Sequence, residues 1–240
     1  MSGHSKWATT KRKKEATDNK RGKIFSKLSK VISVAARSGS DPSSNPSLRV
    51  AIDNAKSASM PKENIERAIQ KGSGSEDGAN YEEIIYEAFG LGGSAILIEC
   101  LTDNKNRALT DVKTVLKKMG GSLVSAGSVS YQFDKQGEII ISTDKNEKSL
   151  DRIEEAIIES GAGDYEIIED EIIVITDYRD LHSVSKKLSD DGIKISSAEL
   201  SYNSSNTVNL EHGDKIKAEN LLEALEDLDD VNKLYTNINF

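Results

Sequence analysis

The sequence predicts an α+β protein: an N-terminal helical bundle followed by two α/β sandwich domains, the last ferredoxin-like (βαββαβ) and inserted into the second. Apolar residues recur at helical spacing up to a Gly/Ser-rich stretch at 72–78, and short apolar strands alternate with helices after it. The length of 240 residues accommodates two or three domains of ordinary size. We expect these domains at 1–77, at 78–133 plus 203–240, and at 134–202.

Three amphipathic helices are expected before the glycine-rich stretch. The first covers 21–37, where apolar residues lie three and four positions apart. Asn45-Pro46 is a typical helix start, with Asn as the cap and Pro at the first helical position, and Met60-Pro61 is a second such start. Short connections between helices of this kind favour a small bundle. The polar segment 6–20 is compatible with a fourth helix or with a partly ordered arm.

Strands and helices alternate after residue 78. The first strands are expected at 84–88 and 95–101, a helix follows at 107–119, and strands at 129–133 and 138–142 flank a turn that contains Gly137.

The order strand, helix, strand, strand, helix, strand is that of a ferredoxin-like sandwich. Its elements are expected at 138–142, 147–160, 165–168, 171–176, 178–190 and 193–201. A helix at 220–228 and a strand at 232–238 then have no partners of their own. We expect them to return to the sheet begun at 84–101, which makes the ferredoxin-like unit an insertion.

The charge of the chain is divided unevenly along its length. The whole chain carries −8, but residues 1–75 hold 16 Lys and Arg against 6 Asp and Glu, a net charge of +10. Residues 76–240 hold 16 against 34, a net charge of −18. Such an asymmetry indicates contact with nucleic acid or a membrane. Docking of the basic head on the acidic remainder of the same chain is the alternative, and the two interpretations can hold together.

The residues that usually carry enzyme chemistry are not arranged for it. The three histidines stand at no metal-ligand spacing from one another or from Cys100, and Cys100 ends an apolar strand, which favours a buried thiol over a nucleophile. The glycines at 90–93 join two strands and favour a turn over a phosphate-binding loop. Carboxylates at 154–159, 169–171 and 227–230 favour a solvated surface over a Mg²⁺ site. We therefore expect a non-enzymatic protein without a metal or cofactor.

The location expected for the chain is the cytoplasm, without a membrane partner. No apolar run approaches the ~20 residues of a membrane-spanning helix, and the first residues lack the apolar core of a secretory signal. A single cysteine cannot form an internal disulfide, which fits a reducing compartment.

Cations are concentrated between residues 6 and 30, with only Glu15 and Asp18 among them. Cations placed on phosphates release condensed counterions, which gives affinity without sequence readout. Trp7 is compatible with stacking on a base or with packing on the bundle. The residues of this segment expected to bind nucleic acid are Lys6, Trp7, Lys11, Arg12, Lys13, Lys14, Lys20, Arg21, Lys23, Lys27 and Lys30.

Several motifs resemble those of the YebC/PmpR family, and they occur in that family's order over residues 3 to about 133. They are Gly3-His4-Ser5-Lys6-Trp7, Lys20-Arg21-Gly22-Lys23-Ile24-Phe25, Asn45-Pro46-Ser47-Leu48-Arg49, Met60-Pro61-Lys62, Glu99-Cys100-Leu101-Thr102-Asp103-Asn104 with Asn106-Arg107, and Gly127-Ser128-Val129.

The resemblance implies three domains, with the third inserted into the second, and a role in regulating gene expression. Bacterial members are described as DNA-binding transcriptional regulators, and others, including a mitochondrial translational activator, are tied to the ribosome and to relief of stalling at proline runs. The implied partners are DNA, ribosomal RNA or tRNA, and the ribosome. A purely ribosomal translation factor that binds RNA and not DNA stays open as the alternative. The resemblance also adds Arg107 to the expected nucleic-acid contacts, although Asp103 and Asn104 before it are typical of a helix cap.

Overall fold

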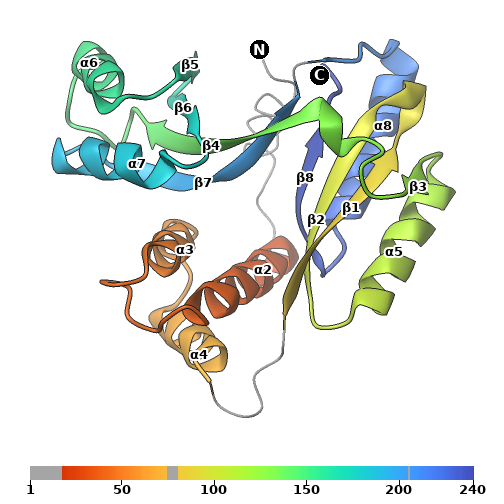
Figure 1. Cartoon of the computed structure of the whole chain (residues 1–240), viewed down its shortest axis with the longest axis horizontal. Helices are drawn as coiled ribbons and strands as arrows, with labels where there is room; N and C mark the ends of the chain where they lie inside the picture. Colours follow the sequence, from red (N-terminus) through yellow and green to blue (C-terminus); the bar gives the residue numbers. More distant parts are fainter. Residues whose placement is uncertain (1–17, 75–80, 205) are drawn as a thin grey trace.

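The structure, a computed structural model, describes residues 18–74, 81–204 and 206–240. The predicted fold class is confirmed. A helical domain precedes two four-stranded antiparallel sheets, and the chain completes the second sheet before it returns to the first (Figure 1). No helix in the described ranges is long and apolar enough to cross a membrane.

The helical domain consists of α2 (Asp18–Ala36), α3 (Pro46–Ser57) and α4 (Lys62–Gly72). The predicted cap of α3 is confirmed, because the side chain of Asn45 accepts the N–H of Leu48 at 3.1 Å. Apolar side chains from all three helices form one buried core around Ile32, Leu48 and Ile65.

Helices α2 and α4 approach one another closely at one end. The hydroxyl of Ser33 donates to the carbonyl of Ala68 at 2.9 Å, and a Cβ placed on Gly72 would lie 2.1 Å from the carbonyl oxygen of Ser33. Only glycine fits at this point, and this contact sets the position of the rest of α4 against α2.

The first sheet has the strand order β3-β1-β2-β8. Its strands are β1 (Glu82–Phe89), β2 (Ala95–Thr102), β3 (Ser122–Val124) and β8 (Val231–Thr236). Helices α5 (Lys105–Lys118) and α8 (His212–Glu226) cover one face, and they share a core with the sheet through residues such as Ile98, Leu116 and Leu222 (Figure 1). The C-terminal helix and strand therefore return to the sheet begun before residue 102, as expected.

The second sheet has the order β5-β6-β4-β7, in which every neighbouring pair is antiparallel. Its strands are β4 (Phe133–Ser142), β5 (Asp164–Ile168), β6 (Glu171–Asp177) and β7 (Ile195–Ser204). Helices α6 (Leu150–Ser160) and α7 (Leu181–Asp190) pack on the face that carries Ile139 and Ile141. This is the ferredoxin-like βαββαβ arrangement.

Two local expectations were wrong in the kind of structure, and the helix expected at 220–228 extends from His212 to Glu226. The segment expected as a strand at 129–133 is mainly a short 3₁₀ turn, Ser130–Gln132, because the carboxylate of Glu87 accepts the N–H groups of Gly127, Val129 and Ser130 and bends the chain there. Gly137 lies inside β4 and not in a turn. A Cβ at Gly137 would come within 2.3 Å of Thr176 Oγ1, so the glycine allows a close approach within the sheet.

Candidate nucleic-acid interface

The expected nucleic-acid contacts fall into three groups in the structure. Six of them, Lys6, Trp7, Lys11, Arg12, Lys13 and Lys14, lie outside the described residues. Lys20 and Arg21 lie in the first turns of α2, where the backbone alone is described. The side chains of Lys23, Lys27, Lys30 and Arg107 are described, and their surroundings show what they contact.

The three described lysines of α2 all reach the C-terminal end of α8 and the turn that follows it. Lys23 Nζ lies 3.2 Å from Asp227 Oδ1, Lys27 Nζ donates to the carbonyl of Glu226 at 2.6 Å, and Lys30 Nζ donates to that of Asp229 at 2.8 Å. The C-terminal end of a helix carries partial negative charge, so cations are stabilised there. In this arrangement the basic helix docks on the acidic part of its own chain, and a role of these lysines in binding nucleic acid stays a prediction.

Asp230 is the most deeply buried carboxylate of this contact, with a side chain that is 7% exposed. Its Oδ1 accepts from Lys30 Nζ at 2.8 Å, and the guanidinium of Arg107 donates to both of its oxygens at 2.8–3.0 Å. Burial by itself would raise the pKa of Asp230, but the hydrogen bonds from Lys30 and Arg107 outweigh burial and hold that pKa below its ordinary value. The ionised carboxylate of Asp230 therefore joins α2 and α5 to the turn before β8.

The segment before Arg107 forms the helix cap that Asp103 and Asn104 predicted. The side chain of Asn104 accepts the N–H of Arg107 at 3.1 Å and caps α5. The guanidinium of Arg107 also donates to Asp103 at 2.7 Å, and these carboxylates raise its pKa. The side chain of Arg107 therefore binds two carboxylates of the same chain. Its contact with nucleic acid stays a prediction.

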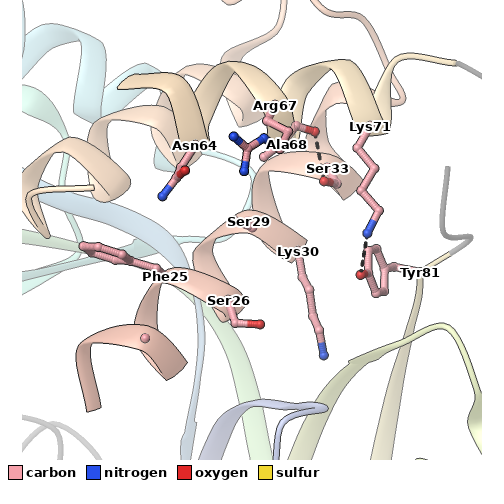
Figure 2. A pocket seen from close by; sticks show the side chains of 11 residues that line it. Phe25, Ser26, Ser29, Lys30, Ser33, Asn64, Arg67, Ala68, Lys71 and Tyr81 are labelled. Atoms are coloured by element: carbon pink, nitrogen blue, oxygen red, sulfur yellow. Dashed lines mark hydrogen bonds between the residues drawn. The ribbon is translucent and has the colours of Figure 1, made fainter. Parts of the chain in front are cut away.

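A different surface of the helical domain is open and basic. Between α2 and α4 there is a hollow of about 370 Å³ that extends to Tyr81, just before β1 (Figure 2). The polar residues that line it are Ser26, Ser29, Lys30 and Ser33 from α2, Asn64, Arg67 and Lys71 from α4, and Tyr81. Among the described residues the lining includes three cations and no carboxylate.

The cations of the hollow differ in how they are held. Lys71 Nζ donates to the hydroxyl of Tyr81 at 3.0 Å and lies 5.0 Å from its ring centroid, so an aromatic side chain orients it. Arg67 is exposed and forms neither a hydrogen bond nor an ion pair with any other residue of the described ranges. Lys30 lies between the hollow and the α8 turn, and its ammonium is committed to Asp230. Of the three lining cations, Arg67 is thus the one whose guanidinium has no partner among the described residues.

The sequence pattern did not indicate Asn64, Arg67 and Lys71, because the charges of α4 nearly cancel and no basic run stands out there. A signal was nevertheless present. These residues lie three and four positions apart, which places them on one face of a helix. What the spacing could not show is that this face lies opposite the serines of α2.

Cys100 and the glycines at 90–93, weighed above for enzyme chemistry, have structural roles. Cys100 is fully buried in β2, and burial raises the pKa of its thiol to about 12, which makes it a poor nucleophile. The glycines form a tight turn between β1 and β2. Within the described ranges no group of three His, Cys, Asp or Glu side chains is placed to hold a metal ion.

Comparisons with known proteins match nearly the whole chain. Residues 5–75 match the family described as "TACO1/YebC protein N-terminal domain", and residues 81–238 match "TACO1/YebC second and third domain". A protein of Chloroherpeton thalassium is 49% identical over 99% of this chain and 95% of its own. One of Desulforamulus reducens is 46% identical over 99% of this chain and 98% of its own. Both relatives carry the name "Probable transcriptional regulatory protein".

A solved structure agrees with these matches. The crystal structure of a conserved hypothetical protein from Aquifex aeolicus superposes with a TM-score of 0.85 at 41% identity. It covers 92% of this chain and 91% of that chain, so the similarity extends over all three parts of the fold.

Proposed function

The chain belongs to the TACO1/YebC family, and we propose that it is a nucleic-acid-binding regulator of gene expression that binds backbone phosphates with the α2/α4 surface of its helical domain. The observation that carries the proposal is that Arg67 and Lys71 lie at one hollow that no described carboxylate lines, while the ammonium of Lys30 at its edge is paired with Asp230. Cations in such a position attract phosphates because each contact releases condensed counterions.

The distribution of charge supports binding at this end of the molecule. Residues 1–75 carry a net charge of +10 and residues 76–240 carry −18. A polyanion is attracted to the helical domain and repelled by both sheets, so the charge pattern orients the protein on its target. The name that the relatives carry, "Probable transcriptional regulatory protein", supports a role in gene regulation.

Phosphate binding fits this surface better than base reading by a recognition helix. Such a helix needs a free face to enter the major groove. In α2, one face packs in the core around Ile32, another carries the lysines that contact the end of α8, and a third lines the hollow. The proposed mode is therefore contact through shape and backbone, a mode common in RNA recognition and in non-specific DNA binding.

A charge-matched pair of double variants tests the proposal. Arg67→Ala with Lys71→Ala should weaken binding to duplex DNA or to a structured RNA hairpin at least fivefold in fluorescence anisotropy. It should also reduce the slope of log Kd against log salt by roughly 0.7–0.9 for each lost contact. Lys56→Ala with Lys62→Ala removes the same net charge from two exposed ion pairs outside the hollow and serves as the control. Equal effects of the two double variants would contradict a site between α2 and α4.

The physiological target is assigned by a second measurement. Co-sedimentation of the tagged protein with ribosomes, compared with its enrichment on promoter DNA, separates a translation factor from a transcriptional regulator. Under this proposal the Arg67→Ala/Lys71→Ala protein loses association with whichever target the wild-type protein binds. If it retains that association fully, the hollow is not the site that matters in the cell.

A further inference from the structure

We propose that the hollow between α2 and α4 receives one unpaired RNA nucleotide, turned out of a bulge or loop, while Arg67 and Lys71 hold its phosphates. This inference rests on the proposed function and narrows its ligand from a phosphate backbone to an exposed base. Three properties of the hollow carry it: its shape, its hydrogen-bonding groups, and the planar groups around it.

The shape of the site goes beyond what phosphate contacts need. A volume of about 370 Å³ falls within the range of roughly 300–1,000 Å³ typical of small-ligand sites. The backbone of a duplex is convex and meets a protein through its outer surface, so it leaves such a hollow unfilled. An unpaired base on a flexible backbone can enter it, and sequence-specific RNA recognition generally uses bases of this kind.

The polar groups of the hollow suit a base edge. The amide of Asn64 offers two donors and one acceptor, and the hydroxyls of Ser26 and Ser29 each donate and accept. Within the described part of the chain, none of these three side chains makes a hydrogen bond. A site for inorganic phosphate needs only cations and other hydrogen-bond donors. Groups that both donate and accept match the mixed pattern along the edge of a nucleobase.

Planar groups lie around the hollow where a base would stack. Phe25 and Tyr81 stand at opposite ends of it, and the guanidinium of Arg67 lies between them on the α4 side (Figure 2). Unpaired bases stack on aromatic rings and on guanidinium planes in RNA-binding proteins. Lys71 is held beside Tyr81, so a phosphate next to the base would meet a pre-oriented ammonium.

The test compares two RNA hairpins of equal length and charge, one fully paired and one with a single bulged 2-aminopurine nucleotide. The wild-type protein should bind the bulged hairpin about tenfold more tightly, the gain expected from one well-stacked base, with a change in 2-aminopurine fluorescence on binding. Ser29→Leu fills the hollow without altering charge. It should lower affinity for the bulged hairpin far more than affinity for the paired hairpin, and so remove the preference.

Two further variants make the result interpretable. Asn64→Leu exchanges the amide for an apolar side chain with the same number and branching of non-hydrogen atoms, and it should also remove the preference. It serves in place of Ser29→Leu if thermal unfolding shows that the Ser29→Leu protein does not fold. Gln70→Leu adds the same side chain on α4 outside the hollow, and should keep the preference. Equal wild-type affinity for the two hairpins would overturn the inference, as would a bulge preference that survives in both hollow variants.

The outcome also separates this inference from the function on which it rests. If Arg67→Ala/Lys71→Ala weakens binding to both hairpins and no bulge preference exists, phosphate binding stands and only the nucleotide site is rejected. If that double variant binds both hairpins as the wild type does, the proposed function fails as well.

Discussion

Lys30 Nζ lies 2.8 Å from Asp230 Oδ1, and this ion pair joins the basic helix α2 to the turn between α8 and β8. The two side chains are 12% and 7% exposed, so the pair is screened from solvent, and Arg107 binds the same carboxylate from α5. Lys30 and Arg107, two of the residues expected to bind nucleic acid, therefore hold the helical domain and α5 to the turn before β8.

Removal of this buried carboxylate should destabilise the protein more than removal of its exposed neighbour. Asp230→Ala leaves the ammonium of Lys30 without its carboxylate in a nearly buried position, and we expect the free energy of unfolding to fall by about 3 kcal/mol. Asp227 pairs with Lys23 at the surface, where its side chain is 69% exposed. Asp227→Ala should therefore cost less than about 1 kcal/mol. Chemical denaturation measures both, and similar losses would contradict a structural role for the buried pair.

The stability of the protein should decline in acid through Glu87. Burial would raise the pKa of Glu87, but the N–H groups of Val129, Gly127 and Ser130 outweigh burial and hold that pKa below its ordinary value. A carboxylate with a lowered folded-state pKa stabilises the protein above its unfolded-state pKa, and this stability is lost as pH falls through the folded-state value.

Glu87→Gln should accordingly unfold more easily near neutral pH and show a weaker dependence of stability on pH between about 5 and 3. Denaturation midpoints measured across this range for both proteins provide the check. A variant whose pH dependence is as steep as that of the wild type would show that other carboxylates dominate the acid response.

The close crossing of α2 and α4 predicts opposite results at two glycines. Gly72→Ala places a Cβ 2.1 Å from the carbonyl oxygen of Ser33, so the helices must separate, and we expect a loss of about 1–3 kcal/mol. At Gly22, inside α2, a Cβ would meet no atom of the described residues within 4 Å apart from its chain neighbours and the backbone of its own helix. Gly22→Ala should be neutral or stabilise the helix by up to about 1 kcal/mol. Thermal unfolding of the two variants measures this difference in stability. A Gly72→Ala variant as stable as Gly22→Ala would contradict a close crossing of α2 and α4.

The docking of α2 on α8 predicts that the acidic part of the chain weakens binding. A fragment of residues 1–75 should bind RNA or DNA more tightly than the whole chain, because it lacks a net charge of −18 and exposes Lys23 and Lys27. The complementary fragment, 76–240, should not bind appreciably. Filter binding of both fragments and the whole chain at one salt concentration gives the comparison. Equal affinity of the two fragments would exclude the helical domain as the binding domain.

The run Lys11-Arg12-Lys13-Lys14, outside the described residues, is predicted from sequence alone to bind phosphates. Four adjacent cations cannot share one helical face, so they suit a segment surrounded by phosphates. Replacement of all four by Gln should weaken binding by a similar factor for unrelated sequences. The slope of log Kd against log salt should flatten by roughly 0.7–0.9 per lost contact. Selective loss of affinity for one preferred sequence would instead indicate that the run reads bases.

Much of the fold was predictable because local chemistry and tertiary structure agree along most of the chain. The cap at Asn45, the helix that ends near Gly72 and the βαββαβ order all follow from spacing and turn residues. The errors occurred where a distant side chain decides local structure. Glu87 shapes the segment at 127–130 from another strand, and the close approach of Thr176 explains why a residue inside a strand, at position 137, is glycine. Neither cause is visible in a local window of sequence.

By itself, the sequence determined which parts of the chain are helical or extended, where charge of each sign is concentrated, and which family motifs are present. These properties depend on side-chain type and spacing, which a linear sequence contains in full. Only the tertiary structure decided which cations face a ligand. Lys23, Lys27 and Lys30 lie in the most basic helix, yet they contact the end of α8 and the turn after it, where backbone carbonyls, Asp227 and Asp230 attract them across about 200 positions of sequence. Arg67 and Lys71 lie in a helix of almost balanced charge, yet the crossing at Gly72 places them at an open hollow. The reason is geometric: the charge of a residue belongs to its side chain, but the partner that it meets is set by how the helices pack.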